Sequence, residues 1–263
     1  MSELLVVKLG GTTVAEQGSA FDALVPLARE RPVVVVHGGG KRVTTWLERL
    51  GIETAFHDGL RITDERSLEV AAAVLRGAVN TELVAALGLR GCPAVGLSGV
   101  DGGSLLVERV PDLGLVGSVR KVRSALLKAL LAARFVPVIA PLGVDRDGVI
   151  CNVNADDAAA GLARGLQARQ LVLLTDVDGI RDGAGHKIDT LTLAEAEGLI
   201  ADGTIGGGMV PKIRSALAAI GTSEQIEAVI ADASAPNALQ RALTEDGFGT
   251  RVRAARAPAA SSA

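Results

Sequence analysis

The sequence predicts an α/β protein, a three-layer αβα sandwich built around a central, largely parallel sheet. Three observations predict this fold class. Short apolar runs without period-two alternation recur along the chain, as in strands that are covered on both faces. Segments with helical spacing separate these runs, as crossovers between parallel strands require. Several of the runs end in glycines where the next helix should begin.

Each element has its own local signal. The segments expected to hold strands are 4–11, 32–40, 93–99, 136–144, 170–180 and 226–234, and the last of these is expected to end the sheet. The segments with helical spacing are 19–30, 41–51, 64–91, 124–135, 154–166, 192–203, 208–221 and 237–246. Gly51 is expected at a helix C-cap, and 64–91 is one long helix or two helices that meet near Gly77. Residues 104–119 predict a hairpin on the surface.

Composition excludes several classes of function. Of 263 residues, 48% are hydrophobic and 22% are charged, which is typical of a globular chain. An aromatic content of 2% and a net charge of −3 provide neither base-stacking surfaces nor a basic face, so no nucleic-acid partner is expected. Cys92 and Cys151 lack metal-site spacing and are interpreted as reduced core residues. No signal peptide and no membrane-spanning apolar run is recognised, so a cytoplasmic protein is predicted.

Glycines gather at one edge of the predicted sheet. The carboxyl ends of parallel strands meet at one edge, and α/β proteins bind their ligands there. Gly10 and Gly11 end the first strand, Gly38 to Gly40 end the second, and 99–103 is a glycine-rich loop after the third. Bare backbone N–H groups before a helix are suited to phosphate, although one such loop alone is equally a tight turn. No Walker A loop or dinucleotide fingerprint is present, which disfavours a nicotinamide-dependent oxidoreductase.

Two lysines and one acidic segment are candidates for chemistry at this edge. Lys8 interrupts an apolar strand, and its ammonium group either reaches a ligand or extends to solvent. Lys212 falls in the first turn of a helix, where the dipole disfavours a cation unless a ligand supplies negative charge; the alternative is an exposed helix lysine. Asn154 or Asp156 is expected to cap a helix, and a carboxylate in this segment is also suited to holding the lysines by salt bridges.

Arg61 and the acidic turn after 170–175 each allow more than one interpretation. Arginine is suited to bidentate binding of a carboxylate, but physical reasoning alone favours a surface residue that pairs with Asp58 or Glu65. For Asp176 and Asp178 three roles are consistent with the sequence: they line a nucleotide pocket, they bind a cation, or they form an Asx turn. The residues alone leave these alternatives open.

Seven motifs occur in an order that resembles the amino-acid kinase family. They are KLGG at Lys8, VVHGGGKRV at Val35, GLRITD at Gly59, AVGLSGVDG at Ala94, NVNAD at Asn152, LLTDVDGI at Leu173 and GGGMVPK at Gly206. Each is weak alone, and the combination covers nearly the whole chain. The resemblance implies the family's αβα fold as a single domain over 1–256, with a frayed tail over 257–263. It also implies an N-terminal lobe of about 1–165 for the acyl amino acid and dimerisation, and a C-terminal ATP lobe of about 166–256.

The resemblance implies an enzyme that uses ATP, with Mg²⁺ on its phosphates, to phosphorylate the γ-carboxylate of N-acetyl-L-glutamate in arginine biosynthesis. Lys8 and Lys212 are expected to neutralise charge on the transferring phosphoryl group, and Asp156 to organise them. The residues expected to bind the acyl amino acid are Gly39, Gly40, Arg61 and Asn152. The residues expected to bind the nucleotide are Gly10, Gly11, Asp176, Val177, Asp178, Gly179, Ile180, Arg181, Thr204, Ile205 and Gly206. No metal ligand is expected from the protein itself.

Rival functions and an oligomeric state complete these expectations. On the same fold, the nearest rival is a kinase of carrier-linked aminoadipate or glutamate in lysine biosynthesis; HDGLRITD and GGGMVPK favour the free acyl amino acid. A non-catalytic amino-acid sensor is disfavoured because Lys8, Asp156 and Lys212 are all present. Arginine-inhibited members of the family share an extra N-terminal helix. Because the first strand is expected to begin at Glu3 or Leu4, we expect a homodimer without arginine feedback.

Overall fold

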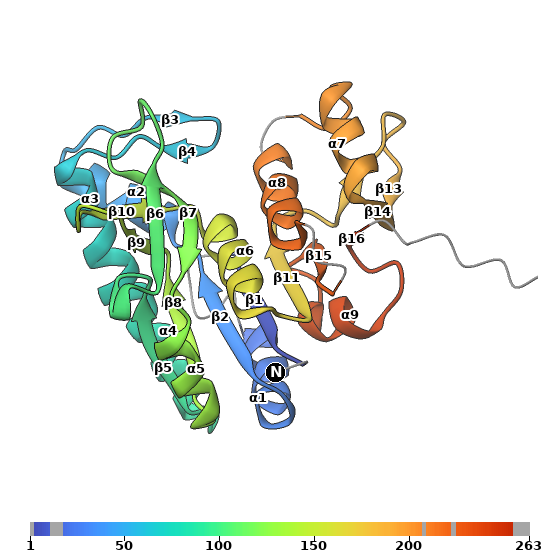
Figure 1. The fold of residues 1–263 in the computed structure, drawn as a ribbon, viewed down its shortest axis with the longest axis horizontal. Coiled ribbons are helices and arrows are strands. Elements are labelled where there is room, and N and C mark those ends of the chain that lie inside the picture. Colours follow the sequence, from blue (N-terminus) through green and yellow to red (C-terminus); the bar gives the residue numbers. More distant parts are fainter. Residues whose placement is uncertain (1–2, 11–17, 207–208, 222–224, 255–263) are drawn as a thin grey trace, which may run out of the picture.

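The computed structural model describes residues 3–10, 18–206, 209–221 and 225–254. Its central sheet has eight strands in the order β14-β16-β15-β11-β1-β2-β8-β5 (Figure 1). These strands are β1 (Leu5–Leu9), β2 (Val33–His37), β5 (Ala94–Ser98), β8 (Val136–Ala140), β11 (Gln170–Thr175), β14 (Thr190–Thr192), β15 (Glu227–Asp232) and β16 (Thr250–Arg253). Six run parallel, whereas β14 and β16 run in the opposite direction because β16 pairs antiparallel with β15. The predicted, largely parallel sheet is confirmed.

Helices cover both faces of this sheet (Figure 1). One face packs with α1 (Gly18–Glu30), α2 (Gly40–Arg49), α3 (Glu65–Ala72), α4 (Asn80–Leu89) and α9 (Ala238–Thr244), and the other with α5 (Ala125–Ala132), α6 (Ala155–Leu166), α7 (Leu193–Ala201) and α8 (Met209–Ile220). Successive residues of β1 alternate between the two cores, so that Val7 contacts the first set of helices and Val6 the second. Lys8 lies two residues after Val6 in β1, so its side chain points to the same face of the sheet, towards α6 and α8.

The predicted long helix is one continuous helical stretch from Glu65 to Leu89, and its middle part, Ala73–Val79, is a π-helix. Its length and mean hydropathy of 1.5 would suffice for one described helix to cross a membrane, but Arg76 and Glu82 interrupt the apolar residues, so the expectation that no uninterrupted apolar run is long enough is not contradicted. Half of its most apolar window is buried inside the fold, where Val74 and Leu87 pack in the core under the sheet. The stretch is therefore a core helix of one face.

Residues 104–122 form part of a small barrel rather than a hairpin on the surface. The barrel strands are β6 (Leu105–Arg109), β7 (Val116–Val122), β9 (Leu142–Val144) and β10 (Ile150–Val153). β6 and β7 pair antiparallel as predicted, but Leu105, Val107 and Val116 are buried. The alternating pattern marks the inner face of the barrel, because closure of four strands hides the side that a free hairpin would expose.

Several short strands were not predicted. Besides β14 and β16, they are β3 (Phe56–His57), β4 (Leu60–Arg61), β12 (Ile180–Arg181) and β13 (Lys187–Ile188). The expectation that the sheet ends at 226–234 is wrong, since β16 follows it and adds to the sheet. Strands of two to four residues carry too little pattern to be recognised. The predicted tail over 257–263 lies outside the described residues. Cys92 and Cys151 are free and buried, as expected.

Candidate active site

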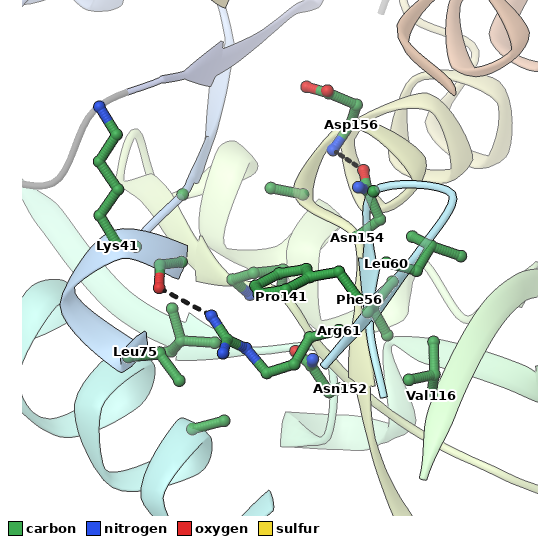
Figure 2. A pocket seen from close by; sticks show the side chains of 18 of the residues that line it. Lys41, Phe56, Leu60, Arg61, Leu75, Val116, Pro141, Asn152, Asn154 and Asp156 are labelled. Carbon is green, nitrogen blue, oxygen red and sulfur yellow. Dashed lines mark hydrogen bonds between the residues drawn. The ribbon is translucent and has the colours of Figure 1, made fainter. Parts of the chain in front are cut away.

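A pocket of about 510 Å³ lies at the carboxyl ends of β1 and β2. Its wall combines the ends of these strands, the hairpin β3–β4 and the first turns of α6 and α8. Figure 2 shows Phe56 and Arg61 of the hairpin beside Asn152, with Asn154 and Asp156 at another side of the same space. Elements that are far apart in the sequence therefore meet at the edge where α/β proteins bind their ligands.

A cluster of three charges lies in the wall of this pocket. The Nζ atom of Lys8 is 2.9 Å from Oδ1 of Asp156, and the Nζ atom of Lys212 is 3.8 Å from Oδ2 of the same carboxylate. The side chains of Lys8 and Asp156 are 9% and 8% exposed, and that of Lys212 is 21% exposed. A buried charge needs a partner, so Asp156 fixes both ammonium groups. The cluster has one more positive than negative charge.

The position of Asp156 follows from the start of α6. The side chain of Asn154 caps this helix, and its Oδ1 accepts hydrogen bonds from the N–H groups of Asp156 (2.8 Å) and Asp157 (3.3 Å). The sequence left Asn154 and Asp156 as candidates for the N-cap, and in the structure Asn154 is the cap. A carboxylate in the first turn also interacts favourably with the positive end of the helix dipole.

The glycine loop Gly38–Gly40 joins β2 to α2. The N–H of Gly38 continues the sheet by donating to the carbonyl of Leu9 (3.0 Å). Gly39 has a φ of 150°, and a Cβ at this position would lie 2.6 Å from Cδ2 of Leu75. Gly40 has no atom within 4 Å of the position of a Cβ. Gly39 is therefore required by the backbone and by packing, whereas Gly40 leaves space in the pocket.

His37, the residue before this loop, is 1% exposed. Burial lowers the pKa of His37 to about 4, and the charge of nearby Arg76 acts in the same direction. Because the unfolded chain binds this proton at a pKa of about 6.5, the stability associated with neutral His37 is fully present above pH 6.5 and is lost as the pH falls towards 4.

We expect His37→Gln to remove this part of the pH dependence. Between pH 7 and pH 5 the free energy of unfolding of the wild type should fall by about 2 kcal/mol more than that of the variant. Urea unfolding at both pH values measures the difference, and the exposed His186→Gln serves as the control. Parallel pH dependence of wild type and His37→Gln would contradict a buried neutral imidazole.

Arg61 is 7% exposed, so the expectation of a surface residue paired with Asp58 or Glu65 is wrong. Its guanidinium donates to Oγ1 of Thr54 (2.5 Å), Oγ1 of Thr44 (2.7 Å) and the carbonyl of Gly40 (3.0 Å), and it lies 4.6 Å from the ring centre of Phe56 (Figure 2). Burial lowers the pKa of Arg61, but an arginine stays charged at neutral pH. No carboxylate of the described residues forms a salt bridge with it, which leaves the guanidinium charge for a ligand.

A second pocket of about 590 Å³ adjoins the first. Its lining residues are Asp176, Val177, Asp178, Gly179, Ile180, Arg181, Thr204, Ile205, Gly206, Met209 and Asp232. Lys212 connects the two pockets, because its Nζ is 4.0 Å from Oδ1 of Asp176 as well as near Asp156. A hydrogen bond from Thr175, together with the charges of Lys212 and Lys8, lowers the pKa of Asp176.

The structure gathers the predicted site residues into two groups. Those assigned to catalysis and to the acyl amino acid all line the first pocket, and those assigned to the nucleotide line the second, except the two glycines after β1. Gly10 lines the first pocket instead, and Gly11 lies outside the described residues. Within the described residues, no group of three His, Cys, Asp or Glu side chains is arranged to hold a metal ion.

Some lining residues were missed from the sequence. Asp232 ends β15 at the same sheet edge, so the rule that placed Asp176 also applied to it. Met209 begins α8 and carries no polar signal. In the first pocket, Phe56 and Thr44 were missed because their position depends on how the short hairpin β3–β4 folds over α2.

Comparisons with known proteins give a consistent assignment. The sequence model of the amino acid kinase family matches residues 3–232. The acetylglutamate kinase of Rubrobacter xylanophilus is 47% identical over 250 residues, which covers 95% of this chain and 96% of that protein. The acetylglutamate kinase of Sinorhizobium medicae is 40% identical over 269 residues, which covers 95% of this chain and 91% of that protein.

Solved structures agree with this result. N-acetylglutamate synthase from Neisseria gonorrhoeae, complexed with coenzyme A and N-acetyl-glutamate, is similar with a TM-score of 0.84 and 27% identity, over 97% of this chain and 60% of that one. The protein smu.665 from Streptococcus mutans has a TM-score of 0.83 and 25% identity, over 97% and 100%. Carbamate kinase from Giardia lamblia, at 18% identity and a TM-score of 0.71 over 97% and 100%, shares the fold. The chain belongs to the amino acid kinase family.

Proposed function

We propose that this chain transfers the γ-phosphoryl group of ATP to the γ-carboxylate of N-acetyl-L-glutamate, which yields N-acetyl-L-glutamyl 5-phosphate and ADP in arginine biosynthesis. The observation that carries the proposal is the cluster of Lys8, Asp156 and Lys212 where two pockets meet. Transfer between two anions needs two adjacent sites with positive charge between them. Relatives named acetylglutamate kinase, 40% and 47% identical over 95% of the chain, support the choice of acceptor.

The first pocket is assigned to the acyl amino acid. Arg61 is held on three sides by Thr44, Thr54 and the carbonyl of Gly40, all uncharged. We assign the α-carboxylate of the substrate to this guanidinium, because a planar fork of donors matches a carboxylate. Asn152, whose amide donates to Thr63 at 3.3 Å, lies in the same wall and is assigned to the bound substrate as well.

The second pocket is assigned to ATP, whose phosphates carry Mg²⁺. Lys212 supports this assignment, because one ammonium group contacts both the wall of the first pocket and Asp176 of the second. The adenosine is assigned to residues 176–181 and 204–206, where backbone and mixed side chains form an open wall. Mg²⁺ supplies neutralisation of the phosphate charges.

The transfer needs alignment and positive charge rather than a general base. The γ-carboxylate of the acceptor is already ionised at neutral pH. One of its oxygens attacks the γ-phosphorus, while the bond between this phosphorus and the oxygen that bridges to ADP breaks. Negative charge is then spread over the transferring oxygens. Lys8 and Lys212 face this charge, and Asp156 keeps both ammonium groups in place before the substrates arrive.

Replacement of Arg61 should weaken the binding of the acceptor and leave the binding of the nucleotide nearly unchanged. We expect Arg61→Ala to raise the KM for N-acetyl-L-glutamate by about 100-fold, because a buried charge-assisted contact is lost. Arg61→Lys should fall between the wild type and the alanine variant, since it keeps the charge but not the fork. The KM for ATP should stay within about twofold in both. Steady-state kinetics with each substrate varied in turn measures this, with the exposed Arg49→Ala as the control. An equal rise in both KM values would remove Arg61 from the acceptor site.

We also propose that the protein is a cytoplasmic homodimer with lobes of about 1–165 and 166–256. Support for the dimer comes from the edge strand β5, which pairs only with β8 in the described sheet. Leu89 and Phe135, which precede β5 and β8, are 90% and 40% exposed, and exposed apolar groups beside an open strand edge favour association. Sedimentation velocity should give twice the chain mass of 26.8 kDa, and a monomer at micromolar concentration would contradict the dimer.

The proposed reaction is tested with a panel of acceptors. Purified protein is incubated with MgATP and each acceptor, and the acyl phosphate is trapped with hydroxylamine as a hydroxamate. N-acetyl-L-glutamate should give product, whereas glutamate and N-acetyl-L-aspartate should not. Product only with a carrier-linked aminoadipate or glutamate would assign the chain to lysine biosynthesis. No product with any acceptor would favour a sensor on the same fold.

A further inference from the structure

His37 and Asn80 form a buried polar pair behind the glycine loop, and the reaction outlined above uses neither of them. They are 1% and 0% exposed. Nδ1 of His37 is 2.7 Å from the carbonyl oxygen of Gly38, and Nε2 is 3.1 Å from Nδ2 of Asn80. Nδ2 of Asn80 also donates to the carbonyl of Val138 at 2.9 Å. Two buried polar side chains thus connect strand β8 with the loop that lines the active site.

These contacts fix the tautomer of the imidazole. A backbone carbonyl only accepts hydrogen bonds, so the atom of Asn80 that faces Val138 is the amide nitrogen. The oxygen of the same amide accepts from Arg76 at 3.3 Å, which agrees with this orientation. The nitrogen of Asn80 therefore donates to Nε2 of His37, and the proton of the neutral ring lies on Nδ1. Nδ1–H then donates to the carbonyl of Gly38.

The fold makes room for Asn80 in two ways. Asn80 directly follows the π-helix Ala73–Val79, and such a segment changes the phase of the residues after it. A Cβ on Gly96 of β5 would lie 2.2 Å from Oδ1 of Asn80, so the absence of a side chain there accommodates the amide. An apolar residue would fill this position without such adjustments.

The carbonyl that His37 holds determines where a catalytic N–H group points. In a trans peptide the C=O and the following N–H point in opposite directions, so fixing the carbonyl of Gly38 also fixes the N–H of Gly39. Gly39 is the N-cap of α2 and has no side-chain cap. Within the described residues, no backbone carbonyl accepts from the N–H of Gly39 or Gly40, and both glycines line the first pocket.

We propose that His37 is a positioning residue. The hydrogen bond from Asn80 keeps the proton of the ring on Nδ1, and Nδ1–H in turn fixes the peptide between Gly38 and Gly39. The N–H groups of Gly39 and Gly40 then face the phosphoryl group during its transfer. This inference rests on the kinase function proposed above. His37 does not touch the substrate; it acts through the loop. The loss of its hydrogen bond is therefore predicted to lower kcat and to leave substrate affinity nearly unchanged, because the peptide is needed most when charge develops in the transition state.

Asn80→Asp is the sharpest variant because it is nearly isosteric but removes the donor. A carboxylate only accepts, so the proton of His37 moves to Nε2 or the ring becomes charged. We expect kcat to fall about 100-fold, with both KM values within about threefold. Asn237→Asp, at an exposed position before α9, makes the same chemical change and should keep the activity of the wild type.

The tautomer itself is read by ¹⁵N NMR of the imidazoles, without substrate. The chain has only three histidines, so the signals of His37 are identified as those that disappear from the spectrum of His37→Gln. The wild type should show His37 as the Nδ1–H form. A wild-type ring with its proton on Nε2 overturns the proposal even if a variant fails to fold.

The outcomes separate this proposal from the proposed kinase function. An inactive wild type in which His37 is nevertheless the Nδ1–H form would reject the kinase reaction and leave the loop geometry intact. An active wild type in which Asn80→Asp keeps its kcat would overturn the positioning role alone. If Asn80→Asp is partly unfolded at 25 °C and has the kcat of the wild type at 10 °C, where it is folded, the loss of activity reflects stability alone. That result would also overturn the positioning role. His37→Gln, which retains an amide donor, should recover part of the kcat that His37→Ala loses.

Discussion

Lys8→Ala is expected to lower kcat by about 100- to 1,000-fold, a loss that is typical when one preorganised donor to a transition state is removed. The affinity for ATP should fall far less, by about threefold or less, because Lys8 is proposed to face charge that develops during transfer. Its ammonium group contacts Asp156 at 2.9 Å, and the lysine side chain is 9% exposed. Lys212→Ala should behave in the same way, since Lys212 contacts the other oxygen of the same carboxylate.

The buried carboxylate makes a control necessary. Without Lys8, Asp156 remains buried, and the more distant Lys212 is its one remaining cationic partner among the described residues, which destabilises the fold as well. The double variant Lys8→Met with Asp156→Asn removes both charges. It should recover stability but not turnover. Lys128→Ala, exposed on α5, should match the wild type. A loss of ATP affinity in Lys8→Ala as large as its loss of kcat would contradict a role in the transition state.

Gly40→Val is expected to abolish turnover while the protein stays folded. A Cβ on Gly40 meets no atom within 4 Å, and Gly40 lines the pocket, so a larger side chain occupies space that the proposed substrate needs. We expect kcat/KM for N-acetyl-L-glutamate to fall at least about 100-fold, as misplacement of a reacting group does. Kinetics combined with a thermal melt measures both parts of this prediction.

The neighbouring glycine provides the contrast. From the sequence, a side chain at Gly39 or Gly40 is expected to block substrate and leave the fold largely intact. For Gly39 the structure contradicts this expectation, because its φ is 150° and a Cβ would lie 2.6 Å from Leu75. Gly39→Ala should therefore lower the melting temperature clearly, and Gly40→Ala should not. Equal melting temperatures for the two alanine variants would show that the loop relaxes without strain.

The sheet could be predicted from the sequence because its strands are local patterns. Runs such as Val33–Val36 are apolar at every position, which occurs when both faces are covered. Lys8 stood out because it is a charged residue in such an apolar run. The alternation of side chains along β1 explains the face of the sheet to which it points. The small barrel and the strands β14 and β16 could not be predicted in this way. The alternating pattern of β6 and β7 predicted their pairing, but closure of the barrel depends on β9 and β10, which have only three and four residues, and β14 and β16 are equally short.

The candidate site was predictable where glycines and charges follow strands. Lys8, Asp156 and Lys212 lie within one cluster although 204 positions separate the outer two, and only the common sheet edge related them beforehand. Arg61 shows the limit of this reasoning. Its sequence neighbours include Asp58 and Glu65, but the fold of the hairpin places it on Thr44, Thr54 and Gly40 instead. The roles assigned to these residues stay predictions until the variants are measured.

The central claim is that the γ-phosphoryl group passes directly from ATP to the γ-carboxylate of N-acetyl-L-glutamate. It is tested most directly by measuring ADP and acyl hydroxamate in the same reaction, with the γ-methyl ester of the acceptor as the matched control. We predict one hydroxamate for each ADP with N-acetyl-L-glutamate, and neither product above background with the ester, whose γ-oxygen is no longer a free anion. ADP that forms without hydroxamate, or at the same rate with the ester, would contradict the claim.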